Sequence, residues 1–168
     1  GFDAVGFGQL ASLGKRFDAV LCLGNSLPHL LDAASMQRAL IDFASVLHPG
    51  GILIIQNRNF DRVWATQERY MPPQYHREGE REWLFVRFYD YHKETITFNM
   101  IRLFREEDAW TQSVESTELR PVFSADLVSG LNAAGFGGLE LYGAYDHSEF
   151  IADQSGDLIV VARKAGSF

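Results

Sequence analysis

The sequence contains a single cysteine and fewer basic than acidic residues. Cys22 cannot form a disulfide within the chain, which favours a reducing, cytoplasmic setting over an oxidising one. The sequence has 15 Lys and Arg and 22 Asp and Glu, which gives a formal net charge of −7. The Lys and Arg residues form no basic stripe along the sequence. This balance argues against general affinity for nucleic acid or anionic membranes, so neither is predicted as a partner.

Other features that are missing narrow the class of protein further. No apolar run approaches the roughly 18 residues that a membrane-spanning helix needs. The five histidines are scattered without an H-x-x-x-H pair, which together with one cysteine predicts no transition-metal site. No G-x-S-x-G motif marks a nucleophilic serine. A chain of 168 residues fits one domain with a sizeable core.

Residues 17–56 have the pattern of a β-α-β unit. Residues 17–23 are almost continuously apolar, which is typical of a strand buried on both faces of a sheet. Asp32 suits the N-cap of a helix whose apolar residues recur at helical spacing. Residues 48–51, "HPGG", are expected to end that helix, and residues 52–56 to form a second buried strand.

The pattern of apolar and polar residues changes after residue 60. Pro72 and Pro73 lie in a polar loop, and three later stretches alternate apolar with polar residues, as antiparallel strands do. Ser124 is then expected to cap a helix, with two closing strands after it. The sequence therefore predicts a single α/β domain, with its core in residues 17–60 and 123–164 and a β-rich insertion in residues 61–122.

Short polar residues follow both strands of the β-α-β unit. Gly24, Asn25 and Ser26 follow the first strand, and Arg58 and Asn59 follow the second. Parallel neighbours end at the same edge of a sheet, where ligands bind in open α/β folds. The alternatives are a plain strand-to-helix turn, since Gly, Asn and Ser favour turns anyway, and a surface arginine. In that second case the arginine would pair with a nearby carboxylate of Asp61 or Glu68.

Two stretches carry a resemblance to a known family: "FDAVLCLGNSLPHL" and "ALIDFASVLHPGGILIIQNRNFD". They resemble class I S-adenosylmethionine-dependent methyltransferases, most closely the branch of the glycine and sarcosine N-methyltransferases. The closing "DLIVVARK" resembles the last strand of that family. The resemblance implies the Rossmann-like methyltransferase fold, S-adenosylmethionine as cofactor, and methyl transfer to a nitrogen atom of a small molecule, without a covalent enzyme intermediate.

The resemblance also implies roles for individual residues. Gly24 and Asn25 are expected to face the substrate amine as catalytic residues. Arg58, with Asn59 beside it, is expected to bind a substrate carboxylate. Residues of the inserted segment are expected to cover the active site as a lid and to contact the substrate; these are Tyr70 and Tyr75. Cofactor contacts are expected from four residues, namely Leu23, Ser26, His29 and Gln9.

Two departures from the family pattern qualify these expectations. The glycine-rich turn and the acidic residue that bind the cofactor in the family lie upstream of anything in this sequence, so the chain resembles a truncated, C-terminal part. "ELRPVFS" stands where glycine-methylating enzymes carry Tyr-Tyr-Pro-His, which leaves the acceptor open. The alternative function is a non-enzymatic β-rich module that binds a ligand or mediates oligomerisation.

Truncation would leave the strand at residues 17–23 as an exposed apolar edge. We therefore expect a homodimer or larger assembly joined near that edge, or else an N-terminal segment, residues 2–10, that covers it.

Overall fold

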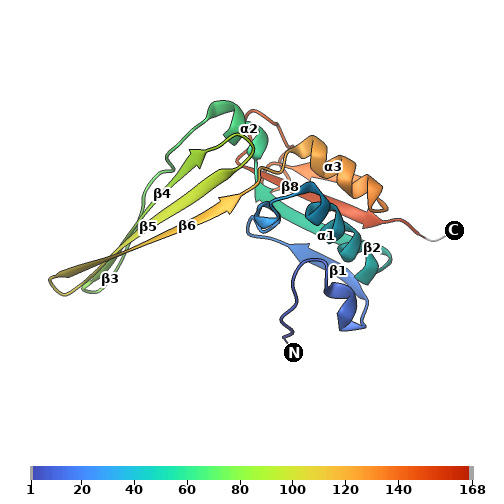
Figure 1. Cartoon of the computed structure of the whole chain (residues 1–168), viewed down its shortest axis with the longest axis horizontal. Helices are drawn as coiled ribbons and strands as arrows, with labels where there is room; N and C mark the ends of the chain where they lie inside the picture. The colour runs from blue at the N-terminus through green and yellow to red at the C-terminus, as the bar shows by residue number, and fades with distance from the viewer. Residues whose placement is uncertain (1, 167–168) are drawn as a thin grey trace. The chain divides into compact units, whose positions relative to one another are not determined.

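The computed structural model describes residues 2–166 of the chain (Figure 1). It divides into two compact units. The first, which we call the α/β unit, comprises the described residues up to Ala65 and those from Val122 onward. The second, the β unit, comprises Thr66–Pro121.

The α/β unit contains a four-stranded sheet in the order β1-β2-β8-β7. Strands β1 and β2 are parallel, whereas β8 runs antiparallel to both β2 and β7. The elements in chain order are η1 (Leu10–Leu13), β1 (Phe17–Cys22), η2 (Leu27–His29), α1 (Ala33–Val46), β2 (Leu47–Arg58), α2 (Phe60–Thr66), α3 (Ser124–Ala133), β7 (Phe136–Tyr142) and β8 (Asp157–Lys164).

Helices α1 and α3 enclose the hydrophobic core of this unit with the sheet. Leu40 of α1 and Leu131 of α3 are both fully buried in the same cluster as Leu53 and Ile55 of β2. Gly130 permits close helix packing, because a Cβ there would lie 2.9 Å from the Leu40 Cδ1 atom. The alternate β2 residues, such as Ile54, are only half-buried, so the helices protect one side of the strand more than the other.

The β-α-β unit predicted for residues 17–56 is present. Cys22 pairs with Ile55 in the parallel register, and α1 connects the two strands. Asp32 caps α1 as expected, because its carboxylate accepts the Ser35 backbone N–H at 2.7 Å. This arrangement of strands and helices confirms the predicted α/β fold class.

α1 ends at Val46, just before "HPGG", but β2 begins at Leu47 rather than at residue 52 and so includes residues 48–51. That strand boundary and two other local predictions were wrong. β1 is not buried on both faces, because it lies at the sheet edge and only Cys22 is buried. Ser124 is the first residue of α3 rather than its side-chain cap; its N–H donates to the Asp61 carboxylate at 3.0 Å instead.

The β unit is an antiparallel sheet in the order β3-β4-β5-β6. Its strands are β3 (Gln74–Glu78), β4 (Arg81–Tyr91), β5 (Ile96–Glu106) and β6 (Ala109–Leu119). The sequence predicted three of them and missed β3, whose residues are all exposed and carry no apolar periodicity. The described residues contain no helix long and apolar enough to cross a membrane.

Candidate functional site

The turn after β1 forms the centre of the candidate site. Gly24 and Asn25 both adopt left-handed backbone conformations, with φ of 73° and 62°. Glycine adopts this conformation without strain, and asparagine tolerates it better than most residues. The turn is tied to β2: the Gly24 N–H donates to the Gln56 side-chain oxygen at 2.8 Å, and the Asn25 N–H donates to the Gln56 carbonyl at 3.1 Å.

The space beside Gly24 is open. A Cβ built on this residue would meet no atom within 4 Å, so the glycine is not required by packing. The Ser26 hydroxyl donates to the Leu23 carbonyl at 2.7 Å, and this hydrogen bond within the turn stabilises its conformation. Leu27 and Pro28 are buried and anchor the following η2. A rigid turn with exposed backbone at the end of a strand suits the close approach of a small ligand.

Asn25 and Arg58 lie side by side, as the parallel strands predict. The Asn25 Oδ1 atom accepts the Arg58 backbone N–H at 3.0 Å. The Arg58 guanidinium lies 3.5 Å from the Asp157 carboxylate, directly opposite it in the β2–β8 register. Asp61, which the sequence offered as a partner for this arginine, instead caps α3.

Asn59 is placed differently from its neighbour. Its side chain is fully buried, and its amide donates to the carbonyls of Ala152 and Ser155, both at 2.9 Å. Its Oδ1 atom accepts the Arg62 N–H at 3.3 Å. These bonds hold the segment before β8 in place. Because the polar atoms of the Asn59 side chain already form hydrogen bonds within the protein, they are not free for the substrate-binding role expected of this residue.

Only some of the residues expected to contact a cofactor lie near one another in the structure. Leu23 and Ser26 belong to the turn itself, and the exposed His29 closes η2 one short segment later. Gln9 lies elsewhere in sequence, just before η1. That helix is held to α1 by Asp42, whose carboxylate accepts the Leu10 N–H at 2.7 Å and the Ala11 N–H at 3.2 Å.

Tyr70 and Tyr75 belong to the β unit, where both are more than half exposed. The Arg69 guanidinium lies over the Tyr70 ring, 5.3 Å from its centroid. Tyr75 lies on β3 and pairs with Leu84 of β4. The expected role of both tyrosines in a lid stays a prediction.

Gln56 and Asp157 are the site residues that sequence reasoning missed. Gln56 ends the apolar run of β2, and this position was the available signal. The partnership of Arg58 with Asp157 depends on the antiparallel pairing of β2 with β8, about a hundred residues later, and the sequence gives no signal for it. Beneath the turn, burial raises the pKa of the Cys22 thiol to about 11, so the thiol is not a nucleophile at neutral pH.

The described residues contain no group of three or more His, Cys, Asp or Glu side chains that could hold a metal ion. The polar groups at the turn are instead amides, a hydroxyl, a guanidinium and a carboxylate. Such groups bind and orient an organic ligand by hydrogen bonding.

Comparison with known proteins identifies the fold. No family model matches the chain. Two solved structures cover 90% and 91% of it: an S-adenosylmethionine-bound amino pentose methyltransferase, CalS10 of Micromonospora echinaspora, and the sugar N-methyltransferase KedS8 of a Streptoalloteichus species. Both have a TM-score of 0.73, with 19% and 20% identity, and this chain covers 60% and 58% of theirs. The chain has the Rossmann-like fold of S-adenosylmethionine-dependent methyltransferases.

The sequence narrows the likeness to one branch of that class. Over 57 residues it is 47% identical to glycine N-methyltransferase of Rattus norvegicus. Over 49 residues it is 49% identical to glycine/sarcosine N-methyltransferase of Aphanothece halophytica. These matches cover 32% and 29% of this chain and about a fifth of each relative, 20% and 18%. They agree with the branch that the sequence motifs resemble.

Proposed function

We propose that this chain forms the acceptor side of an S-adenosylmethionine-dependent N-methyltransferase that acts on a small-molecule amine. The observation that carries the proposal is the turn at Gly24 and Asn25, whose left-handed backbone is tied to Gln56 and Arg58 at the carboxyl ends of two parallel strands. The sequence match to glycine N-methyltransferases supports the same function.

The residues at the turn fit such a cofactor. The open space beside Gly24 admits a ligand to the backbone, and Leu23, 39% exposed, offers an apolar contact. Ser26 and His29 add polar groups nearby, and Gln9 is the further candidate for the adenine side. When bound, the cofactor supplies a methyl group on a positively charged sulfur.

Asn25 and Arg58 would position the acceptor. One lone pair of the Asn25 Oδ1 atom accepts the Arg58 N–H, and the second remains for an N–H of the acceptor amine. Such a contact would hold the amine with its own lone pair toward the methyl group. Positioning of two reactants accounts for most of what this chemistry requires of the protein.

The Arg58–Asp157 pair bears on the choice of acceptor. A carboxylate on the acceptor would have to compete with Asp157 for the guanidinium. An acceptor with hydroxyl groups could instead hydrogen-bond to both members of the pair. The solved relatives include sugar N-methyltransferases, whereas the relatives in sequence methylate glycine, so both kinds of amine belong in the test.

The experiment is a methyl-transfer assay with isotope-labelled S-adenosylmethionine, offered glycine and an amino sugar in parallel. Asn25→Gly keeps the turn backbone and removes the side chain, so we expect kcat/KM to fall at least tenfold, because lost positioning slows the reaction. The matched control is Asn132→Ala on the exposed face of α3, which should leave transfer unchanged. If substitutions at both Asn25 and Arg58 leave transfer and ligand binding unaffected, the non-enzymatic module is the better account.

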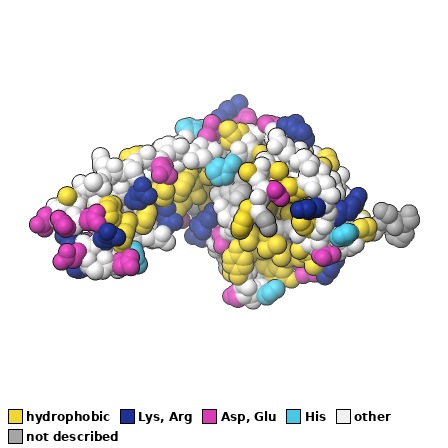
Figure 2. Space-filling view, turned by 90° about the horizontal axis from the view of Figure 1, so that it is seen from below, with side chains coloured by type: hydrophobic (Ala, Val, Ile, Leu, Met, Phe, Trp, Pro, Cys, Tyr) yellow, Lys and Arg dark blue, Asp and Glu magenta, His cyan; other side chains and the backbone are white. Residues whose placement is uncertain are grey.

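The proposed setting is a cytoplasmic homodimer or larger assembly joined along β1. Among residues 2–166 no strand pairs with the outer edge of β1, and residues 2–9 form no strand that could cover it. Leu21 is 59% exposed, and hydrophobic side chains gather on this face of the α/β unit in Figure 2. An unpaired apolar edge favours association with another strand. The buried, reduced Cys22 supports the cytoplasmic assignment.

A further inference from the structure

A groove on the β unit is lined by residues that the proposed methyl transfer does not use. Its volume is about 440 Å³. Six residues line it: Trp83, Arg102, Phe104, Thr111, Gln112 and Ser113. They come from the three adjacent strands β4, β5 and β6, so the groove lies wholly within this one sheet.

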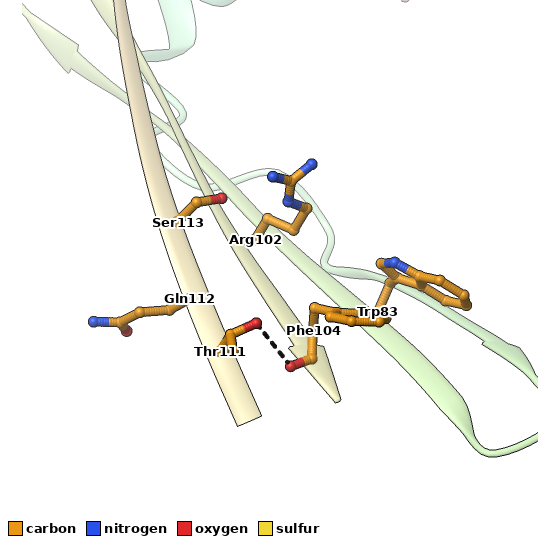
Figure 3. A pocket seen from close by; sticks show the side chains of 6 residues that line it. All are labelled: Trp83, Arg102, Phe104, Thr111, Gln112 and Ser113. Carbon is orange, nitrogen blue, oxygen red and sulfur yellow. Dashed lines mark hydrogen bonds between the residues drawn. The ribbon is translucent and has the colours of Figure 1, made fainter. Parts of the chain in front are cut away.

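The floor of the groove is aromatic. The Trp83 and Phe104 rings lie opposite each other in the β4–β5 register, with centroids 5.2 Å apart and planes inclined by 34°. His76 extends the row from β3, 5.4 Å from Trp83. Figure 3 shows the Trp83 and Phe104 side chains next to each other on the same side of the sheet. A row of nearly parallel rings offers a flat ligand a surface on which to stack.

The polar side of the groove is cationic. Arg102 has no hydrogen bond or ion pair with the described residues, whereas Arg81 and Arg105 of the same sheet pair with Glu106 and Glu82. In Figure 3 the Ser113 hydroxyl points toward Arg102, while Gln112 points to the other side of the sheet. The Thr111 hydroxyl is bound to the Phe104 carbonyl at 3.4 Å.

A second cation lies on the same face. Arg87 pairs with Met100 two rungs from the Phe85–Arg102 pair, and its Nε atom is buried without a hydrogen-bond partner among the described residues. Glu115, opposite Met100 on β6, is a carboxylate on this face, and neither arginine pairs with it. The unpaired Arg102 guanidinium lines the groove beside the stacked rings, and Arg87 lies further along the same face, so an anionic group of a ligand would find a cationic partner there.

We propose that this groove binds a small molecule that carries an anionic group on a flat ring. The ring would stack on Trp83 and Phe104, the anion would accept hydrogen bonds from the Arg102 guanidinium fork, and the Ser113 hydroxyl would donate to the same anion. This site is independent of the turn at Gly24, and its existence does not depend on the methyl-transfer activity.

The test is a titration of the 168-residue chain with phenyl phosphate, followed by NMR through the indole N–H of Trp83 and the backbone amides of residues 102–113. Inorganic phosphate supplies the anion alone, and benzyl alcohol supplies the ring alone. We expect saturable shifts with phenyl phosphate and clearly weaker binding of either half. Arg102→Met should weaken binding at least about tenfold, since a charge-assisted hydrogen bond is lost, and Glu115→Gln should strengthen it.

Lys93→Met is the matched control, because it removes the same charge from an exposed loop of the same unit. Equal loss of affinity in Lys93→Met and Arg102→Met would overturn the proposal, since only net charge would then matter. Equal binding of phosphate and phenyl phosphate would also overturn it. If the same signals shift on dilution without ligand, a second copy of the chain occupies this face and the proposal is wrong.

Discussion

The Asn25 side-chain oxygen accepts the backbone N–H of Arg58 at 3.0 Å and thereby joins the ends of β1 and β2. This bond fixes the turn whose left-handed backbone exposes Gly24. Asn25 follows β1 and Arg58 is the last residue of β2, and the parallel register brings the two together. The proposed site depends on this one relationship more than on any other contact in the α/β unit.

Two substitutions of Asn25 separate its hydrogen bond from its backbone conformation. Asn25→Gly loses the bond to Arg58 and keeps the backbone freedom, so we expect a loss of about 1 kcal/mol in the free energy of unfolding. Asn25→Ala loses the same bond and adds left-handed strain of about 1 kcal/mol. Urea denaturation measures both. A milder effect of alanine than of glycine would contradict the backbone conformation described here.

The buried Asp42 carboxylate holds η1 against α1. Asp42→Ala should leave the N–H groups of Leu10 and Ala11 without acceptors and cost about 2 kcal/mol of stability. We also expect faster hydrogen exchange at those two amides, measured by NMR. Asp126→Ala, at an exposed position of α3, serves as the control. Unchanged exchange at Leu10 and Ala11 would show that Asp42 does not anchor this segment.

The cap of α1 should make stability depend on pH in the acidic range. The hydrogen bonds from Ser35 hold the pKa of Asp32 below its ordinary value. The stabilisation is therefore fully present above the unfolded pKa, about 4, and is lost as pH falls through the lower folded pKa. Asn in place of Asp32 caps without titrating. The difference in Tm between the wild type and Asp32→Asn should shrink between neutral pH and about pH 2.5; a constant difference would refute the coupling.

Self-association should depend on the free edge of β1. Leu21→Lys places a charge on the exposed strand, and charged residues on edge strands oppose pairing with other chains. We expect sedimentation velocity to show fewer dimers than for the unmodified chain. Val114→Lys is the control, since Val114 is comparably exposed on β6 of the other unit. Loss of dimers with Val114→Lys instead would place the contact on the β unit.

Local pattern was enough to predict the β-α-β unit and the Asp32 cap, because apolar runs, helical spacing and cap chemistry all lie within a few residues. It failed where distant residues decide the structure. The cap of α3 comes from Asp61, more than 60 residues away, and the Arg58 partner comes from β8. β3 and the short α2 were missed because β3 is polar throughout and α2 has only seven residues.

In the proposed function, a methyl donor binds at the turn after β1. The most direct measurement is an NMR titration of the 168-residue chain with S-adenosylhomocysteine. We expect saturable shifts concentrated at residues 23–29 and 56–58. They should be reduced in Gly24→Val, because a side chain there would enter the open space beside the backbone and would strain its left-handed conformation. Absence of saturable shifts, or shifts confined to residues 66–121, would contradict the proposed function.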